Sequence, residues 1–157
     1  MKRSRCVDLQ DNLAALYKPG EFAEIRPDPG ASDRRSVWLR GGHQEWAFRI
    51  PGSALPAKAR AGKWKVYAVV RVEKDHAGAP GAQAFSAGVY DNKARSSLAE
   101  IKPCLSEAAS DFQSYLLGEL ELNPDRDIWV APAGNKSIKA IYVDRIFLVP
   151  ARASPSK

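Results

Sequence analysis

The sequence predicts an all-β fold, an antiparallel β-sandwich of the jelly-roll type. Three observations predict it: short runs rich in β-branched and aromatic residues recur along the chain, turns rich in Pro, Gly, Asn and Asp separate them, and almost no stretch has helical periodicity. We expect about nine strands. We also expect one domain over residues 1–157, with residues 1–20 as a lead-in and 151–157 as a flexible tail.

The composition is that of a globular protein, with 45% hydrophobic and 27% charged residues. No run approaches the roughly 20 apolar residues of a membrane helix, and no apolar segment of a signal peptide follows Met1–Cys6. The net charge of +6 favours nucleic acid or an anionic polysaccharide as partner. Lys and Arg are scattered and no zinc-ligand spacing occurs, so we expect no nucleic-acid partner. Cys6 and Cys104 are far apart, and two cysteines do not define a disulfide framework.

Residues 1–20 are expected to form an irregular or briefly helical lead-in, because leucines recur at near-helical spacing over residues 8–17. A strand over residues 21–25 and a loop rich in Pro, Gly and Asp follow. Residues 36–40 and 45–50 are predicted strands, and the GGHQ between them suits a hairpin. The longest strand of this half covers residues 63–74 and alternates apolar and polar side chains.

The second half continues with strands over residues 84–92 and 97–101 and over 111–122, where Gly118 indicates a bulge. Two last apolar runs, IWVA and IYVDRIFLV, are separated by PAGNKS, which has the composition of a turn. Alternation places a set of large side chains in the core: Trp46, Phe48, Trp64, Val66, Val70, Phe85, Val89 and Trp129.

Asp144 interrupts the last apolar run, where burying a bare carboxylate costs several kcal/mol. It needs an Arg, backbone N–H groups or a metal ion as partner, or it points to solvent on a half-exposed sheet. These alternatives stay open on the residues alone.

Several motifs carry a resemblance over residues of about 8 to 150: DPGASD, EWAFRIP, GKWKVYAVVRV and the closing IYVDRIFLV. They resemble the galactose-binding-like jelly roll of many carbohydrate-binding modules. GVYD, YLLGELEL and IWVAPAGN are similar to C-terminal domains of large bacterial polysaccharide-degrading proteins. The resemblance implies a secreted or periplasmic protein in which the chain accompanies a catalytic domain of the same polypeptide or complex.

The same resemblance implies a structural calcium ion. Carried over residue by residue, its ligands are Glu24, Asp28, Asp33 and Asp144, because carboxylates and loop carbonyls suit Ca²⁺. The sequence departs from the usual pattern in having Arg34 and Arg35 in place of small residues and no evident acid pair on the first strand. An ion pair between Asp144 and an Arg such as Arg26 is the alternative.

No catalytic constellation is evident. The two histidines, His43 and His76, lack a ligand spacing, no GxSxG occurs, and Glu119 and Glu121 are typical of a solvated strand face. We therefore expect a protein that is not an enzyme.

Sugar binding needs an exposed aromatic ring flanked by hydrogen-bonding groups. The residues expected to supply these are Trp38, His43, Tyr67, Arg71, Tyr90, Asp91 and Asn92. Tyr67 with Arg71, and Tyr90 with Ser86, are expected on one face of two neighbouring strands, where Gly88 leaves room for a ligand. The positive charge favours an acidic or sulfated polysaccharide read by Arg71. The alternative function is a structural or protein-docking domain whose aromatic face packs on a neighbour.

Overall fold

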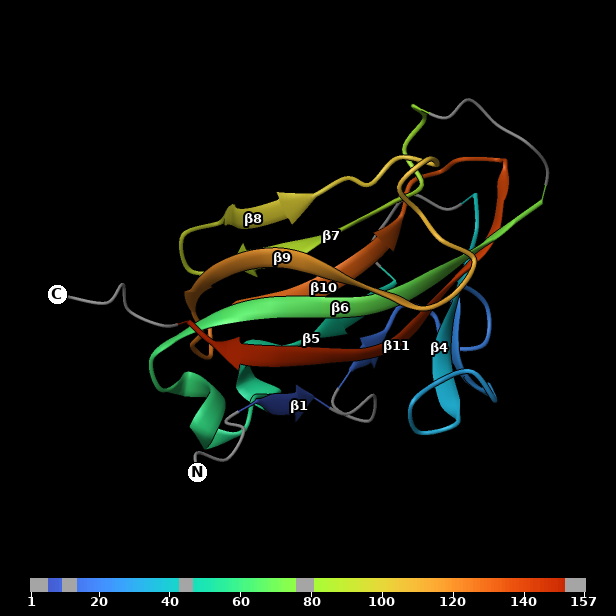
Figure 1. Ribbon diagram of the computed structural model, residues 1–157. Coiled ribbons are helices and arrows are strands. Elements are labelled where there is room, and N and C mark those ends of the chain that lie inside the picture. Colours follow the sequence, from blue (N-terminus) through green and yellow to red (C-terminus); the bar gives the residue numbers. More distant parts are fainter. Residues whose placement is uncertain (1–5, 10–13, 43–46, 76–80, 152–157) are drawn as a thin grey trace, which may run out of the picture.

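In the computed structural model, two antiparallel β-sheets pack face to face, as Figure 1 shows. The structure describes residues 6–9, 14–42, 47–75 and 81–151. All pairings between its named strands are antiparallel, so the predicted all-β sandwich is confirmed.

The six-stranded sheet has the order β3 (Ala23–Pro27), β4 (Arg35–Arg40), β11 (Ile138–Pro150), β6 (Lys63–Lys74) and β9 (Gln113–Glu121), and β1 (Val7–Leu9) also pairs with β11. The five-stranded sheet has the order β2 (Ala15–Leu16), β5 (Phe48–Ile50), β10 (Arg126–Pro132), β7 (Phe85–Asp91) and β8 (Ser96–Ile101). Two short 3-10 helices, η2 (Gly52–Ala54) and η3 (Ala57–Arg60), join β5 to β6.

Strand β11 organises the six-stranded sheet. It pairs with β6 along its whole length, and its other edge pairs first with β4 and then with β1. The register with β6 shifts between Val143 and Arg145, so Asp144 is an extra residue in a β-bulge. Val143 and Ile146, on either side of the bulge, are both fully buried.

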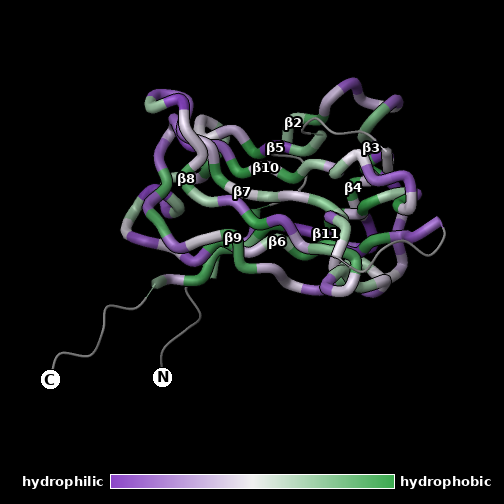
Figure 2. Tube along the Cα trace, turned by 90° about the horizontal axis from the view of Figure 1, so that it is seen from above, coloured by the Kyte–Doolittle hydropathy of each residue, from purple (hydrophilic) through white to green (hydrophobic). Residues whose placement is uncertain are grey.

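The core lies between the sheets. Figure 2 shows hydrophobic residues along the strands and many of the hydrophilic ones in the connecting loops. Six of the predicted core residues are buried: Phe48, Trp64, Val66, Val70, Phe85 and Val89. Trp46 lies outside the described residues.

The helical alternative for the lead-in is wrong at both ends of residues 8–17. Val7–Leu9 pairs with β11, and Ala15–Leu16 pairs with β5; residues 10–13 are outside the described part. Val7 and Leu9 are buried at a spacing of two, which is the period of a strand. Pairing also satisfies backbone groups on the edge of β11 that β4 leaves open.

The predicted hairpin between β4 and β5 is also wrong, because these strands lie in different sheets. The chain leaves β4 at Gly41, where a Cβ atom would lie 2.0 Å from the carbonyl oxygen of Ile138. Only glycine allows this approach to β11. Residues 43–46 lie outside the described residues.

Within the described residues, two further points concern the cysteines and the helices. Cys6 and Cys104 form no disulfide with each other. None of the helices described here has the length and apolar character needed to cross a membrane.

Replacing Gly88 by Ala is expected to destabilise the sandwich. A Cβ atom there would lie 2.1 Å from the Ala99 carbonyl oxygen, so β7 and β8 must move apart. Such overpacking costs about 1–3 kcal/mol, which lowers Tm by roughly 2–4 °C per kcal/mol in a chain of this size. Thermal unfolding of Gly88→Ala and of Gly81→Ala, whose added Cβ meets no atom within 4 Å, checks this. Equal Tm values for the two variants would contradict it.

Candidate functional site

Strand β10 places a tryptophan on the outer face of the five-stranded sheet. Ile128 and Val130 are fully buried in the core, so Trp129 between them points the opposite way, with Asp127 and Ala131 at the same parity. The prediction that Trp129 belongs to the core is therefore wrong. Its two neighbours along β10, Ile128 and Val130, occupy the buried face of the sheet at this place.

Cross-strand register extends this position into a row. Trp129 lies opposite Gly88 on β7 and Arg49 on β5, and Gly88 lies opposite Glu100 on β8. Neighbouring strands are about 4.8 Å apart, so the backbones of Glu100 and Arg49 are separated by roughly 14 Å. The row thus presents a carboxylate, a glycine without a side chain, an indole and a guanidinium in that order.

A β-bulge in β8 brings Glu100 to this face. The register with β7 shifts between Val89 and Tyr90, which leaves Leu98 as the extra residue. Ser97 and Glu100 consequently share the outer face although they are three residues apart. Without the bulge, Glu100 would have the parity of the buried face.

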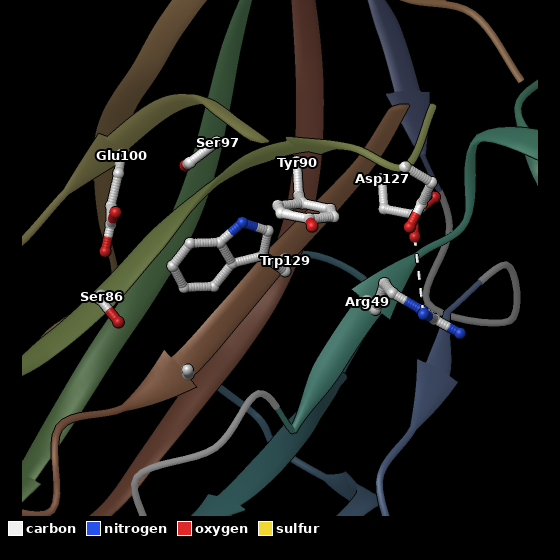
Figure 3. Close-up of a pocket in the computed structure, with 9 residues that line it drawn as sticks. Arg49, Ser86, Tyr90, Ser97, Glu100, Asp127 and Trp129 are labelled. Atoms are coloured by element: carbon white, nitrogen blue, oxygen red, sulfur yellow. Dashed lines mark ion pairs between the residues drawn. The ribbon is translucent and has the colours of Figure 1, made fainter. Parts of the chain in front are cut away.

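These side chains line a pocket of about 550 Å³. Its walls consist of Arg49, Ser86, Tyr90, Asn92, Ser97, Glu100, Asp127, Trp129 and Ala131, and we refer to it as the Trp129 pocket. In Figure 3 the indole lies between Glu100 and Ser86 on one side and Tyr90, Asp127 and Arg49 on the other. Among the described residues, no ring stack or cation covers the indole.

The charged groups of the pocket differ in how they are held. Asp127 is 6% exposed, accepts a hydrogen bond of 2.9 Å from the Gly52 N–H, and lies 3.5 Å from the Arg49 guanidinium. Glu100 lies 4.0 Å from the Lys102 ammonium, whose side chain is 62% exposed, so this second pair is loose and solvated. Arg49 and Asp127 neutralise each other, and the Glu100 carboxylate remains as the excess charge of the pocket.

The structure separates the predicted ligand residues. Tyr90 and Asn92 line the Trp129 pocket, but Tyr67 and Arg71 lie on β6 in the other sheet. The prediction that they form one cluster on neighbouring strands is wrong, because alternation fixes which face a side chain occupies but not which strands are neighbours. The space beside Gly88, expected to admit a ligand, is taken by the β8 backbone.

Two more predicted ligand residues lie outside the Trp129 pocket. Asp91 is 7% exposed and accepts hydrogen bonds from the N–H groups of Lys93 and Ala94 and from Arg126. The Ala94 N–H and then Arg126 lower the pKa of Asp91, which identifies it as the anchor of a turn. Trp38 lies on β4, and His43 lies outside the described residues.

The aromatic rings on the outer face of the six-stranded sheet are covered. Tyr67 stacks on Phe147 with ring centroids 4.9 Å apart, and Arg145 lies over Phe147. The guanidinium of Arg26 lies 4.0 Å from the Trp38 ring centroid. Arg71 lies 3.8 Å from that of Tyr142. Each of these contacts removes a ring face that a sugar would need.

The four predicted calcium ligands have protein partners. Glu24 pairs with Arg26 at 2.9 Å, so Arg26 is not the partner of Asp144 as the alternative proposed. Asp144 is 7% exposed and accepts hydrogen bonds of 3.0 and 2.9 Å from the N–H and hydroxyl of Ser32. Burial raises the pKa of Asp144, and the Ser32 hydrogen bonds only partly offset this.

The other two carboxylates also pair with arginines. Arg71 donates to Asp28 at 3.0 Å, and Arg35 lies 3.9 Å from Asp33. Among the described residues, no group of three or more His, Cys, Asp or Glu side chains is arranged to hold a metal ion. These positions therefore do not fit a carboxylate-rich calcium site, and calcium stays a prediction from the resemblance.

Sequence reasoning missed Trp129, Arg49, Glu100, Ser97 and Asp127 as pocket residues. A signal for Trp129 existed, since it alternates with two β-branched core residues in DIWVA. Arg49 had a similar signal between Phe48 and Ile50. Glu100 had none, because its orientation depends on the bulge.

Comparison with known proteins shows a similarity of fold. No protein-family model matches the chain, and no curated protein matches it. Among solved structures, it is similar to the C-terminal CBM6, a carbohydrate-binding module, of the marine laminarinase LamC from Zobellia galactanivorans. The TM-score is 0.54 and the identity 8%, over 92% of this chain and 99% of that one.

Two further solved structures are similar. CBM27-1 of Caldicellulosiruptor saccharolyticus, in complex with mannohexaose, has a TM-score of 0.53 and 10% identity, over 96% of this chain and 100% of that one. The GH26-CBM35 β-(1,4)-mannanase of Podospora anserina has a TM-score of 0.59 and 16% identity, over 98% of this chain. The chain spans 29% of that mannanase. The predicted fold, the jelly roll of carbohydrate-binding modules, is confirmed.

The calcium prediction has a direct test in thermal unfolding. An ion held only by the native protein raises Tm by mass action, so calcium bound at these positions would make Tm rise with added calcium and fall with a chelator. Asp144→Asn should remove this response, because it deletes a charged ligand. A Tm that neither calcium nor chelator changes would contradict the ion and leave Ser32 as the partner of Asp144.

Acid should weaken the contact of Asp28 with Arg71. Burial alone would raise the pKa of Asp28, but hydrogen bonds from Arg71, Ser36 and the Gly30 N–H outweigh it and lower the pKa below 3.8. A lowered pKa contributes stability above the unfolded value, and this is lost as pH falls through the folded value. Asp28→Asn should therefore destabilise the protein at neutral pH and progressively less below about pH 3.8.

Urea unfolding at several pH values measures this difference. Asp33→Asn is the matched control, because its partner Arg35 lies at 3.9 Å and both side chains are more exposed. A constant difference between wild type and Asp28→Asn across the acid range would contradict the assignment.

Proposed function

We propose that this chain is a non-catalytic carbohydrate-binding module that binds a polysaccharide in the Trp129 pocket. The observation that carries the proposal is the uncovered indole on the outer face of the five-stranded sheet, inside a pocket of about 550 Å³. Ligand pockets commonly have volumes of about 300–1,000 Å³ with apolar and aromatic walls and a few polar groups.

The chemistry of the pocket suits a sugar ring. The apolar C–H face of a pyranose packs on an aromatic face, and its hydroxyl groups need donors and acceptors around the rim. Trp129 supplies the face, and Tyr90 extends it with a half-exposed ring. Ser86, Ser97 and Asn92 supply hydroxyl and amide groups at the edges.

Likeness to solved modules supports the ligand class. Two of the similar structures are carbohydrate-binding modules, one of them holding mannohexaose. The mannanase combines such a module with a catalytic part in one chain. By this analogy, the chain serves a secreted or periplasmic polysaccharide-degrading enzyme, which it holds on its substrate and whose effective local concentration it raises.

The pocket is proposed to bind without catalysis. Glycoside hydrolysis needs two carboxyl groups, one as acid and one as base or nucleophile. Asp127 is buried between Arg49 and the Gly52 N–H, which engage both of its oxygens. It therefore holds the guanidinium in place and does not face the ligand as a free base.

An acidic or sulfated ligand has less support at this pocket. It was expected from Arg71, which pairs with Asp28 and lies on the opposite face of the sandwich. Arg49 faces the pocket, but Asp127 neutralises it and Glu100 would repel an anion. A panel of neutral and acidic polysaccharides decides between these ligands.

Replacing Trp129 by Ala should abolish retention on the cognate polysaccharide without unfolding the domain. A buried Trp contributes about 150–250 Å², and covering one face removes roughly half of it from water, which is worth about 2–3 kcal/mol. Affinity should therefore fall by about 30- to 150-fold. Gel retardation against the polysaccharide panel measures it, with Tm recorded for each variant.

Tyr67→Ala is the control on the opposite face. It removes the stack on Phe147, so Tm should fall while retention stays unchanged well below Tm. Retention that is lost in Tyr67→Ala and kept in Trp129→Ala would place the site on the six-stranded sheet. Absence of binding across the whole panel would favour the protein-docking alternative.

A further inference from the structure

Glu100 holds an unusual place in the Trp129 pocket. The pocket contains one cation and two carboxylates, a formal charge of −1, whereas the whole chain carries +6. Because Asp127 and Arg49 pair with each other, the excess charge resides on Glu100. At physiological ionic strength the Debye length is about 8 Å, so a ligand in the pocket senses this nearby charge more than the distant Lys and Arg residues.

The fold directs this carboxylate into the pocket. The β8 bulge at Leu98 reverses the parity of the residues that follow it. Ala99 then turns inward, and Gly118 on β9 leaves space for its methyl group, since a Cβ atom at Gly118 would lie 2.6 Å from it. Bulges often re-aim a side chain beside a functional site. The orientation of Glu100 therefore rests on a contact between the two sheets.

We propose that the Trp129 pocket selects glycans that carry free amino groups, and that Glu100 binds the ammonium group. This inference rests on the proposed function and names the substrate class of the same site. A protonated amine on a sugar ring meets two favourable partners here, the Glu100 carboxylate and the aromatic faces of Trp129 and Tyr90.

The alternatives are weaker on charge grounds. A carboxylate or sulfate on the sugar would be repelled by Glu100. A hydroxyl group would donate a hydrogen bond to Glu100 but would gain no ion pair, and an N-acetylated amine would carry no charge. Lys102 is the one cation paired with Glu100 among the described residues, and at 4.0 Å with an exposed side chain it is readily displaced.

Three oligosaccharides of equal length and the same β-1,4 backbone test the proposal. They are the oligomer of glucosamine, its N-acetylated counterpart and the corresponding cello-oligosaccharide. Calorimetric titration at about pH 5.5, where an amine is protonated, should give the tightest binding for the glucosamine oligomer. Glu100→Gln should weaken that binding by about five-fold, as expected for an exposed ion pair, and leave the other two unchanged.

Two control variants separate local from general effects. Glu119→Gln removes the same charge from an exposed position on β9 in the other sheet and should leave all three affinities unchanged. Lys102→Ala removes the competing cation and should retain or strengthen binding of the glucosamine oligomer. An equal loss in Glu119→Gln would reduce the effect to net charge and overturn the role of Glu100.

The outcomes distinguish this inference from the proposed function. Tighter binding of the cello- or N-acetylated oligomer, or an unchanged affinity in Glu100→Gln, overturns amine selection. If binding is still lost in Trp129→Ala, the proposed sugar-binding function stands. If Trp129→Ala leaves the affinity for every glycan in this series unchanged, the pocket itself is not the binding site and both proposals fail.

Discussion

One extra residue in the longest strand is the constraint on which the six-stranded sheet depends. Ile141 and Val143 face the core before the bulge, and Ile146 and Leu148 face it afterwards. In a regular strand, one of these pairs would be turned to solvent, at a cost of about 1.5–3 kcal/mol for each side chain. The bulge at Asp144 avoids this and leaves one polar residue between the two halves, where β4 stops pairing and β1 begins. The N–H and hydroxyl of a loop serine satisfy its carboxylate, so the bulge also fixes the loop that follows β3.

The same device shapes the opposite sheet, with a different result. In β11 the bulge keeps apolar residues inside, whereas in β8 it brings a carboxylate outside. Strand β10 supplies Asp127, Trp129 and Ala131 to the pocket without any irregularity, because Ile128 and Val130 face the core and Trp129 between them must face outward. Arg49 reaches the same row from β5, and Asp127 holds it there. The pocket is thus built on strands with fixed registers, and its polar rim is positioned by backbone geometry.

Much of this fold follows from the sequence, and the limits are physical. Nine predicted strands correspond to β3–β11, since period-two patterns are local. Sheet membership is not local, so the β4–β5 hairpin and the pairing of Tyr67 with Tyr90 were wrong. The β11 bulge could have been predicted, because the apolar residues Val143 and Ile146 are three residues apart and a regular strand repeats every two. Glu100 offered no such sign, because the β8 bulge depends on Ala99 fitting beside a glycine of the other sheet.

Counting exposed aromatic residues is therefore a poor guide to a sugar site in this fold. Among the described residues, the six-stranded sheet carries more aromatic rings on its outer face than the five-stranded sheet, yet guanidinium groups or neighbouring rings cover them. Arginine over an aromatic ring is a stabilising contact of about 0.5–1 kcal/mol at exposed sites, and a sugar would have to displace it. Trp129 has no such competitor among the described residues. A ligand gains the whole stacking energy only where a ring face is free, and this criterion selects the sheet that has fewer aromatic residues.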